Sequence, residues 1–126
     1  MEPGSFDPQV NLGGVLLNMN RFNEALQFNL RAVQARPNDA LPNAQLGMTY
    51  MGLGKPDEAE SYLKAAERID PAHFSDPQWF LAGIYASRGD NEAAIGELRA
   101  LIEQHPDEIV AQRARRAMER LEDALR

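Results

Sequence analysis

Few residues in the sequence have the types and spacing that chemistry requires. Gly52-Leu53-Gly54-Lys55 approaches a phosphate-binding loop, but such a loop needs an earlier glycine where Thr49 stands and Ser or Thr where Pro56 stands. His73 and His105 each stand alone, whereas a metal site needs several converging ligands. We therefore expect both histidines to be solvated, and we predict neither a metal nor a cofactor.

Catalysis by other groups is also disfavoured. The 19 carboxylates are plentiful, but none has an apolar setting that would raise its pKa for acid catalysis. The chain has no cysteine, which excludes thiol nucleophiles and thiolate metal sites, and no Ser-His-Asp arrangement follows from the spacing. Arg88-Gly89-Asp90 matches an integrin-type tripeptide, but a turn and a helix cap account for it. We predict that the chain is not an enzyme and has no catalytic residues.

The charge distribution argues against a nucleic-acid partner. The formal net charge is −6, and residues 1–106 account for all of it, because residues 107–126 carry five arginines and five acids. Phosphate binding needs clustered Lys or Arg, which residues 1–106 lack. In the tail, Arg115 precedes Glu119 and Glu122 precedes Arg126 by one helical turn, which is typical of a solvated helix face.

Composition gives some information about membrane insertion and cellular compartment. No stretch approaches the roughly 18 consecutive apolar residues of a membrane span, so we expect no membrane insertion. The absence of cysteine fits the cytosol and many secreted proteins alike, which leaves the compartment open with the cytoplasm slightly favoured.

The elements that would position a binding surface come from an internal repeat. Similar stretches close at Pro37, Pro71 and Pro106, which lie 34 and 35 residues apart. On this register three kinds of position coincide: Leu12-Gly13 with Leu46-Gly47 and Leu81-Ala82, Leu16 with Tyr50 and Tyr85, and Ala25 with Ala59 and Ala94. The turn between the halves of each repeat reads Asn20, Gly54 and Gly89.

This pattern resembles the tetratricopeptide repeat (TPR) family, in which Leu-Gly, Tyr, a turn Gly, two Ala and a closing Pro recur. The resemblance covers about residues 7–106 and implies an all-α, right-handed superhelical solenoid of antiparallel helix pairs. It assigns one domain over 1–126, or a fragment of a longer array, with repeats at about 7–37, 40–71 and 76–106 and a capping helix at about 107–125. The family's aromatic of the second helix is replaced by Asn29, Leu63 and Leu98.

Local signals predict the helix bounds. Asp7-Pro8 and Asp76-Pro77 each offer an N-cap followed by a first-turn proline, and Asp39 can cap a further helix. The expected helices span about 7–19, 22–35, 40–53, 56–69, 76–88, 91–104 and 107–125. In the last of these, an apolar face covers the end of the stack and comprises Val110, Ala114, Ala117, Met118, Leu121 and Leu125.

Small residues recur where two helices would cross. Gly13 and Gly47 lie at one phase of the repeat, and Ala25 and Ala59 lie on the partner helices. Glycine inside a helix costs up to about 1 kcal/mol relative to alanine. Its recurrence therefore indicates close helix packing.

The resemblance also implies a binding surface, because family members line an inner wall with the first helix of each pair and bind peptides or helices there. By register, the wall positions are Asp7, Val10, Gly14, Leu17, Asn18, Leu41, Ala44, Gln45, Met48, Met51, Gly52, Asp76, Trp79, Phe80, Gly83, Ala86 and Ser87. The predicted partner-binding residues among them are Val10, Leu17, Leu41, Gln45, Met48, Met51, Asp76, Trp79 and Phe80. The competing interpretation is that the Met and aromatic side chains are core and that Gln45 is solvated.

One type of ligand is disfavoured. Family members that grip the C-terminal carboxylate of heat-shock chaperones use lysine, asparagine and arginine at five wall positions. This chain has Val10, Gly14, Gln45, Asp76 and Phe80 there, which supply no cation and would repel a carboxylate.

The first helix is more apolar than one partner helix can cover, since Leu12, Val15, Leu16 and Leu17 lie close together. Earlier repeats that have been removed, self-association, or Phe6 folding back would each account for this. The leading function is a protein-protein interaction module or scaffold that binds a peptide or helix in its groove. The alternative is a structural module that forms a homo-oligomer through its N-terminal helix.

Overall fold

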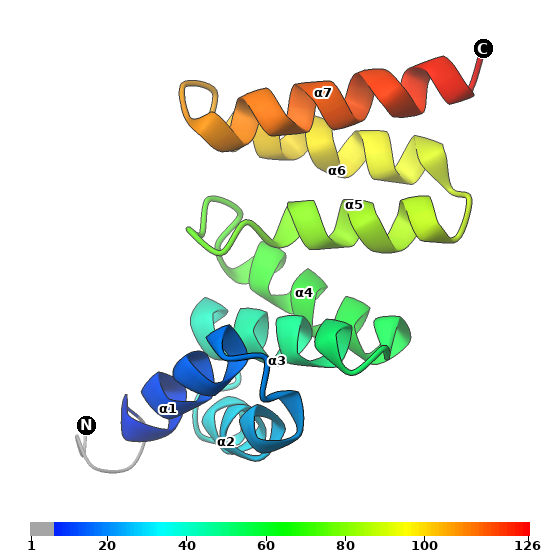
Figure 1. Ribbon diagram of the computed structural model, residues 1–126. Coiled ribbons are helices and arrows are strands. Elements are labelled where there is room, and N and C mark those ends of the chain that lie inside the picture. Colours follow the sequence, from blue (N-terminus) through cyan, green and yellow to red (C-terminus); the bar gives the residue numbers. More distant parts are fainter. Residues whose placement is uncertain (1–6) are drawn as a thin grey trace. The chain divides into compact units, whose positions relative to one another are not determined.

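A computed structural model of the chain describes residues 7–126, which form seven α-helices and no strand (Figure 1). The helices are α1 (Asp7–Asn18), α2 (Phe22–Ala35), α3 (Ala40–Gly52), α4 (Pro56–Ile69), α5 (Pro77–Ser87), α6 (Asn91–Gln104) and α7 (Ile109–Ala124). Each helix begins and ends within about two residues of its predicted bounds. The all-α prediction is confirmed. No helix among these residues combines the length and apolar character that crossing a membrane requires.

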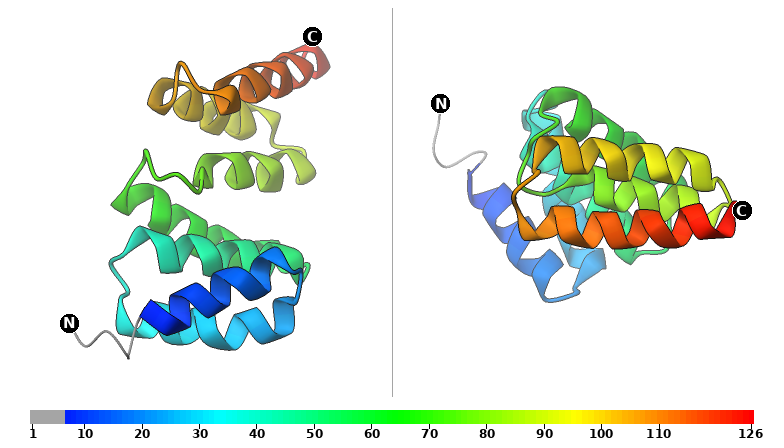
Figure 2. Two further views of the ribbon diagram at one scale, coloured as in Figure 1. Left: turned by 60° about the vertical axis from the view of Figure 1, so that its left-hand side comes forward. Right: turned by 90° about the horizontal axis from the view of Figure 1, so that it is seen from above.

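The chain divides into two compact units, Met1–Asp70 and Pro71–Arg126. In the first unit α1 pairs with α2 and α3 pairs with α4, while α1 and α2 also pack against α3. In the second unit α6 packs against both α5 and α7, and the three helices run in alternating directions (Figures 1 and 2). The predicted antiparallel helix pairs are therefore present in both units.

The turns inside the three helix pairs share one backbone conformation. Asn20, Gly54 and Gly89 have φ values of 59°, 73° and 81°, in the left-handed region that glycine and asparagine tolerate. The amide of the next residue then donates a hydrogen bond of 2.9 Å back to the preceding helix, from Arg21 to Leu16, from Lys55 to Tyr50 and from Asp90 to Tyr85. The predicted turn positions are confirmed.

Glycine permits the close approach of paired helices in the first unit. A Cβ atom added to Gly47 of α3 would lie 2.7 Å from Cγ of Leu63 and 3.3 Å from the carbonyl oxygen of Ala59, both in α4. A Cβ atom added to Gly13 of α1 would collide with the side chain of Asn29 in α2. Neither site has room for a methyl group, as the repeat pattern predicts.

Two of the predicted helix caps are absent. The side chains of Asp39 and Asp76 precede α3 and α5 but accept no capping hydrogen bond, whereas Asp90 accepts one of 3.1 Å from the amide of Ala93. Within each unit, an amide side chain at an equivalent register position instead binds the carbonyl group of the preceding proline. Asn43 donates to the carbonyl of Pro37 at 3.0 Å, and Gln78 donates to the carbonyl of Pro71 at 2.7 Å.

Candidate functional site

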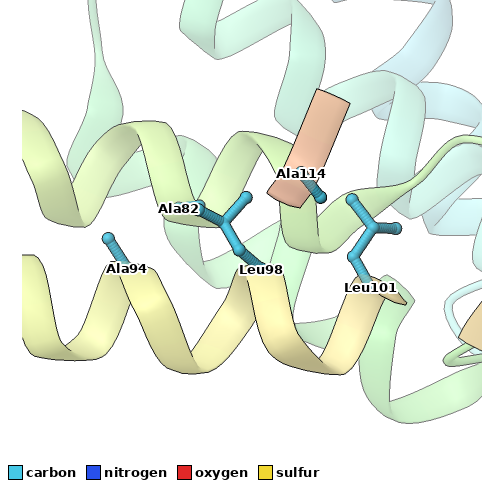
Figure 3. Close-up of a cluster of buried hydrophobic side chains, with 5 residues drawn as sticks. All are labelled: Ala82, Ala94, Leu98, Leu101 and Ala114. Carbon is cyan, nitrogen blue, oxygen red and sulfur yellow. The ribbon is translucent and has the colours of Figure 1, made fainter. Parts of the chain in front are cut away.

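The second unit has an apolar core built from small residues and two leucines. Leu98 and Leu101 point from α6 toward Ala82 of α5 and Ala114 of α7 (Figure 3). Because the alanines are short, α5 and α7 approach α6 closely. α7 packs against α6, although Leu125, which follows α7 and belongs to its predicted apolar face, is exposed rather than packed.

An open cleft of about 270 Å³ lies between α5 and α7, with Leu98 of α6 among its lining residues. Its other lining residues are Trp79, Ala82, Gly83 and Ala86 from α5 and Ala117, Arg120 and Leu121 from α7. The four α5 residues recur at helical spacing, so they form one face of that helix. A Cβ atom added to Gly83 would meet open space, which shows that this wall is not filled from within.

Trp79 stands between the cleft and a second hollow. The second hollow is lined by Ser75, Asp76, Trp79, Phe80, Val110 and Arg113. The guanidinium carbon of Arg113 in α7 lies 5.5 Å from the centroid of the indole ring, a cation–π arrangement. Trp79 is half-buried, so part of its ring remains accessible. The structure thus brings the predicted residues Asp76, Trp79 and Phe80 together.

Asp76 lies at the start of α5 in a left-handed conformation, with φ of 54°. Its Oδ1 atom lies 3.6 Å from Nε2 of His105, and Nδ1 of His105 lies 3.1 Å from Oε2 of Glu108. Burial raises the pKa of the Asp76 carboxyl, the charge of Glu108 adds to the rise, and His105 and His73 oppose it.

These contacts correct two expectations from the sequence. His105 is only 9% exposed and packs between two carboxylates, so the prediction that it is solvated is wrong. Asp76 has a setting that raises its pKa, which no carboxylate was expected to have. The turns that join α4 to α5 and α6 to α7 put these residues together, and the repeat pattern carries no information on contacts between turns.

The predicted residues of the first unit fall into two groups. Val10 is buried, and Gln45 is 8% exposed, so the structure contradicts the prediction that these two side chains are accessible contacts. The half-buried group comprises Leu17, Leu41, Met48 and Met51. The side chain of Asp7, a further wall position, lies outside the described residues, as does Phe6.

Gln45 belongs to a buried polar network. Its Nε2 atom donates to the carbonyl of Val10 at 3.0 Å and to Oδ1 of Asn29 at 2.9 Å. Asn29 in turn donates from Nδ2 to Oγ1 of Thr49 at 3.0 Å, and Thr49 donates to the carbonyl of Gln45 at 2.7 Å. Amide side chains that are buried in folded proteins almost always have hydrogen-bond partners. Gln45 therefore joins α1, α2 and α3 rather than facing solvent.

Sequence reasoning missed the α7 side of the cleft. Gly83 and Ala86 follow from the register, but Ala117, Arg120 and Leu121 follow the last closing proline, where the repeat pattern ends. The available signal was the spacing of Arg113, Ala117 and Arg120 along one flank of the capping helix.

Three solved structures share this architecture. The type III secretion translocator chaperone SycD of Yersinia enterocolitica superimposes with a TM-score of 0.89 over 97% of this chain and 86% of that chain, at 13% identity. PcrH, solved in complex with the chaperone-binding region of PopD, gives 0.88 over 95% and 92%, at 15% identity. YrrB, a TPR protein with an unusual peptide-binding site, gives 0.77 at 32% identity, over 87% of this chain and 56% of YrrB.

The sequence itself carries the family pattern. No curated protein matches it, but the family model for the tetratricopeptide repeat matches residues 50–118, which is more than half of the chain. That match includes α4, α5 and α6 entirely and most of the residues that line the cleft. Together with the paired helices, the left-handed turns and the superimposed structures, it shows that the chain belongs to the tetratricopeptide repeat family.

Proposed function

We propose that the chain is a protein-interaction module, in which the cleft between α5 and α7 receives a side chain from a peptide or helix of a partner protein. The observation that carries this proposal is the half-buried Trp79 beside an open, apolar cleft. Soluble proteins bury such features unless they bind something there. Tryptophan is also enriched among the residues that contribute most to binding free energy.

The superimposed structures support a peptide as the ligand. PcrH was solved with a region of PopD, and YrrB is named for a peptide-binding site. The half-buried Leu17, Leu41, Met48 and Met51 extend the proposal to the first unit, because flexible methionines suit irregular apolar partners.

The function that we propose is not enzymatic. The cleft lining holds apolar side chains and one arginine, so it offers no acid, base or nucleophile to a substrate. Asp76 and His105 contact each other at the adjoining turns, where they join α5 to the α6–α7 connection.

Filling the cleft tests the proposal. Gly83→Leu places a side chain in the cleft without an internal clash, since a Cβ atom there meets open space. Gly96→Leu is the matched control, because Gly96 of α6 is also helical, exposed and unobstructed but does not line the cleft. In capture from a cell extract, we expect the wild type and Gly96→Leu to retain the same partners and Gly83→Leu to retain about tenfold less. Equal retention by all three proteins would reject the cleft as the site.

A second candidate function, self-association, is favoured by the outer face of α1. Leu12, Val15 and Met19 are 41%, 53% and 55% exposed and lie along one stripe. By register Leu12 and Val15 correspond to Leu46 and Thr49 of α3, which are fully buried. Residues 8–20 contain no charged residue, so two copies of this face could meet without like-charge repulsion.

Light scattering tests the second candidate. Under this hypothesis the chain forms dimers at tens of micromolar, and Val15→Glu gives monomers because it buries a charge at the contact. Gln27→Glu, which adds the same charge to an exposed position of α2, leaves the dimer intact. A wild-type chain that stays monomeric at these concentrations excludes self-association.

A further inference from the structure

Two arginines of α7 border the apolar cleft. Arg120 lines the cleft itself, and Arg113 lies against Trp79 on the side of the second hollow. They are seven residues apart, which is close to two helical turns, so they project from the same flank of α7 about 10 Å apart along its axis. The cleft therefore has a cation near each end of its α7 wall.

Neither cation forms an ion pair within residues 7–126, although Asp76 lines the same hollow as Arg113. Arg113 and Arg120 form no ion pair with any described carboxylate, whereas Arg126 of the same tail pairs with Asp123 at 2.9 Å. Arg116 lies between them at helical spacing, so three like charges follow one another along α7. Like charges at this spacing destabilise a helix. An anion bound beside the cleft would relieve that repulsion.

The size and lining of the cleft indicate which kind of ligand side chain would enter it. Its volume of about 270 Å³ and its lining of alanine, glycine, leucine and tryptophan suit an aliphatic side chain. Because Ala86 and Ala117 have only methyl side chains, they do not fill the cleft, and Leu98 of α6 supplies a further apolar contact. The side chain that enters should be uncharged, because the lining offers no charged group besides Arg120 at its edge.

We propose that the partner segment is acidic and extended, with a leucine-like side chain in the cleft and carboxylates that contact Arg113 and Arg120. This inference rests on the proposed function of the cleft and names the chemistry of its ligand. An extended chain of the polyproline II type advances about 3.1 Å per residue with three residues per turn, so carboxylates three positions apart lie on one face and match the spacing of the two arginines. The cations that bind the ligand belong to the capping helix, not to the wall positions where carboxylate-gripping family members carry theirs.

The test uses three pools of peptides with blocked termini, so that no terminal carboxylate contributes. Each pool contains a fixed leucine between two fixed residues three positions apart, which are Glu in the first pool, Gln in the second and Lys in the third. The remaining positions are randomised among neutral residues other than Trp and Tyr. Trp79 is the only tryptophan in the chain, so its fluorescence reports binding at the cleft directly.

We expect the Glu pool to bind most tightly and the Lys pool least, with the preference for Glu reduced by added salt. Equal binding of the Glu and Gln pools, or preference for Lys, overturns the inference but leaves peptide binding in place. If no pool changes the fluorescence of the wild-type chain, both the inference and the proposed cleft function are rejected.

A second experiment substitutes Arg120. Arg120→Gln should weaken binding of the Glu pool by about threefold to fivefold and leave binding of the Gln pool unchanged. Arg99→Gln, at an exposed position of α6, is the matched control and should change neither. Arg120→Glu should reverse the preference so that the Lys pool binds best. If Arg120→Glu still prefers the Glu pool, the proposed contact is wrong.

Discussion

At the scale of single residues, Asp76 combines three features that rarely meet in one side chain. It occupies the left-handed region, it is partly buried, and its carboxylate faces His105 and Glu108. Asparagine and aspartate adopt this backbone conformation more readily than other residues with a side chain. The residue type therefore suits the turn, while its charge is poorly solvated there.

The raised pKa of Asp76 makes stability depend on pH. The folded state holds the proton to a higher pH than the unfolded chain, whose Asp pKa is about 3.9, so the free energy of unfolding falls as pH rises between the two pKa values. Asp76→Asn keeps the backbone preference and removes this ionisation. In urea unfolding followed by circular dichroism, the free energy of unfolding of the variant should increase relative to that of the wild type as pH is raised from about 3.5 to 6. A difference that stays constant or shrinks over that range contradicts the assignment.

The buried amides show where residue-level prediction stops. Asn29 replaces the aromatic residue of the family pattern. This difference indicates where the polar network lies, but it does not identify the side chains that bind Asn29. Gln45 was assigned to the binding surface because the register gives only the phase of a residue on its helix. Its partners come from α1 and α2, and that proximity appears only when three helices are packed.

At the scale of elements, the sequence predicts the helices well. Proline, glycine and aspartate lie at the start or end of most of the helices, and these residues act through local backbone preferences that need no tertiary contacts. The capping side chains are predicted less well. Asp39 and Asp76 precede their helices as expected, but Asn43 and Gln78 bind the preceding proline carbonyls. That interaction repeats on the same register and was visible in the sequence as a recurring amide.

Two glycines with opposite surroundings test the packing of the helix pairs. Gly47→Ala inserts a methyl group against Leu63 and the Ala59 carbonyl, so it should lower the free energy of unfolding by about 1 to 3 kcal/mol. Gly96→Ala adds its methyl group in open space and should raise that free energy by up to about 1 kcal/mol through helix propensity. Urea denaturation measures both. If Gly47→Ala stabilises the chain as much as Gly96→Ala does, α3 and α4 are not in close contact.

At the scale of the molecule, the repeat predicts the all-α class and the helix pairs but only half of the candidate site. The α5 wall lies inside the third repeat, and its residues follow from the register. The α7 wall lies beyond the closing proline, so its role had to be taken as that of a simple cap. The structure shows that the cap also completes the cleft and supplies the two arginines beside it.

Amide NMR spectra of the chain, recorded with and without a peptide segment of a partner that the wild type captures, locate the binding surface residue by residue. If the cleft is the binding surface, the shifted resonances cluster in residues 79–86 of α5 and 113–121 of α7, with the indole N–H of Trp79 among them. Shifts confined to other surfaces, such as the outer face of α1, would contradict it.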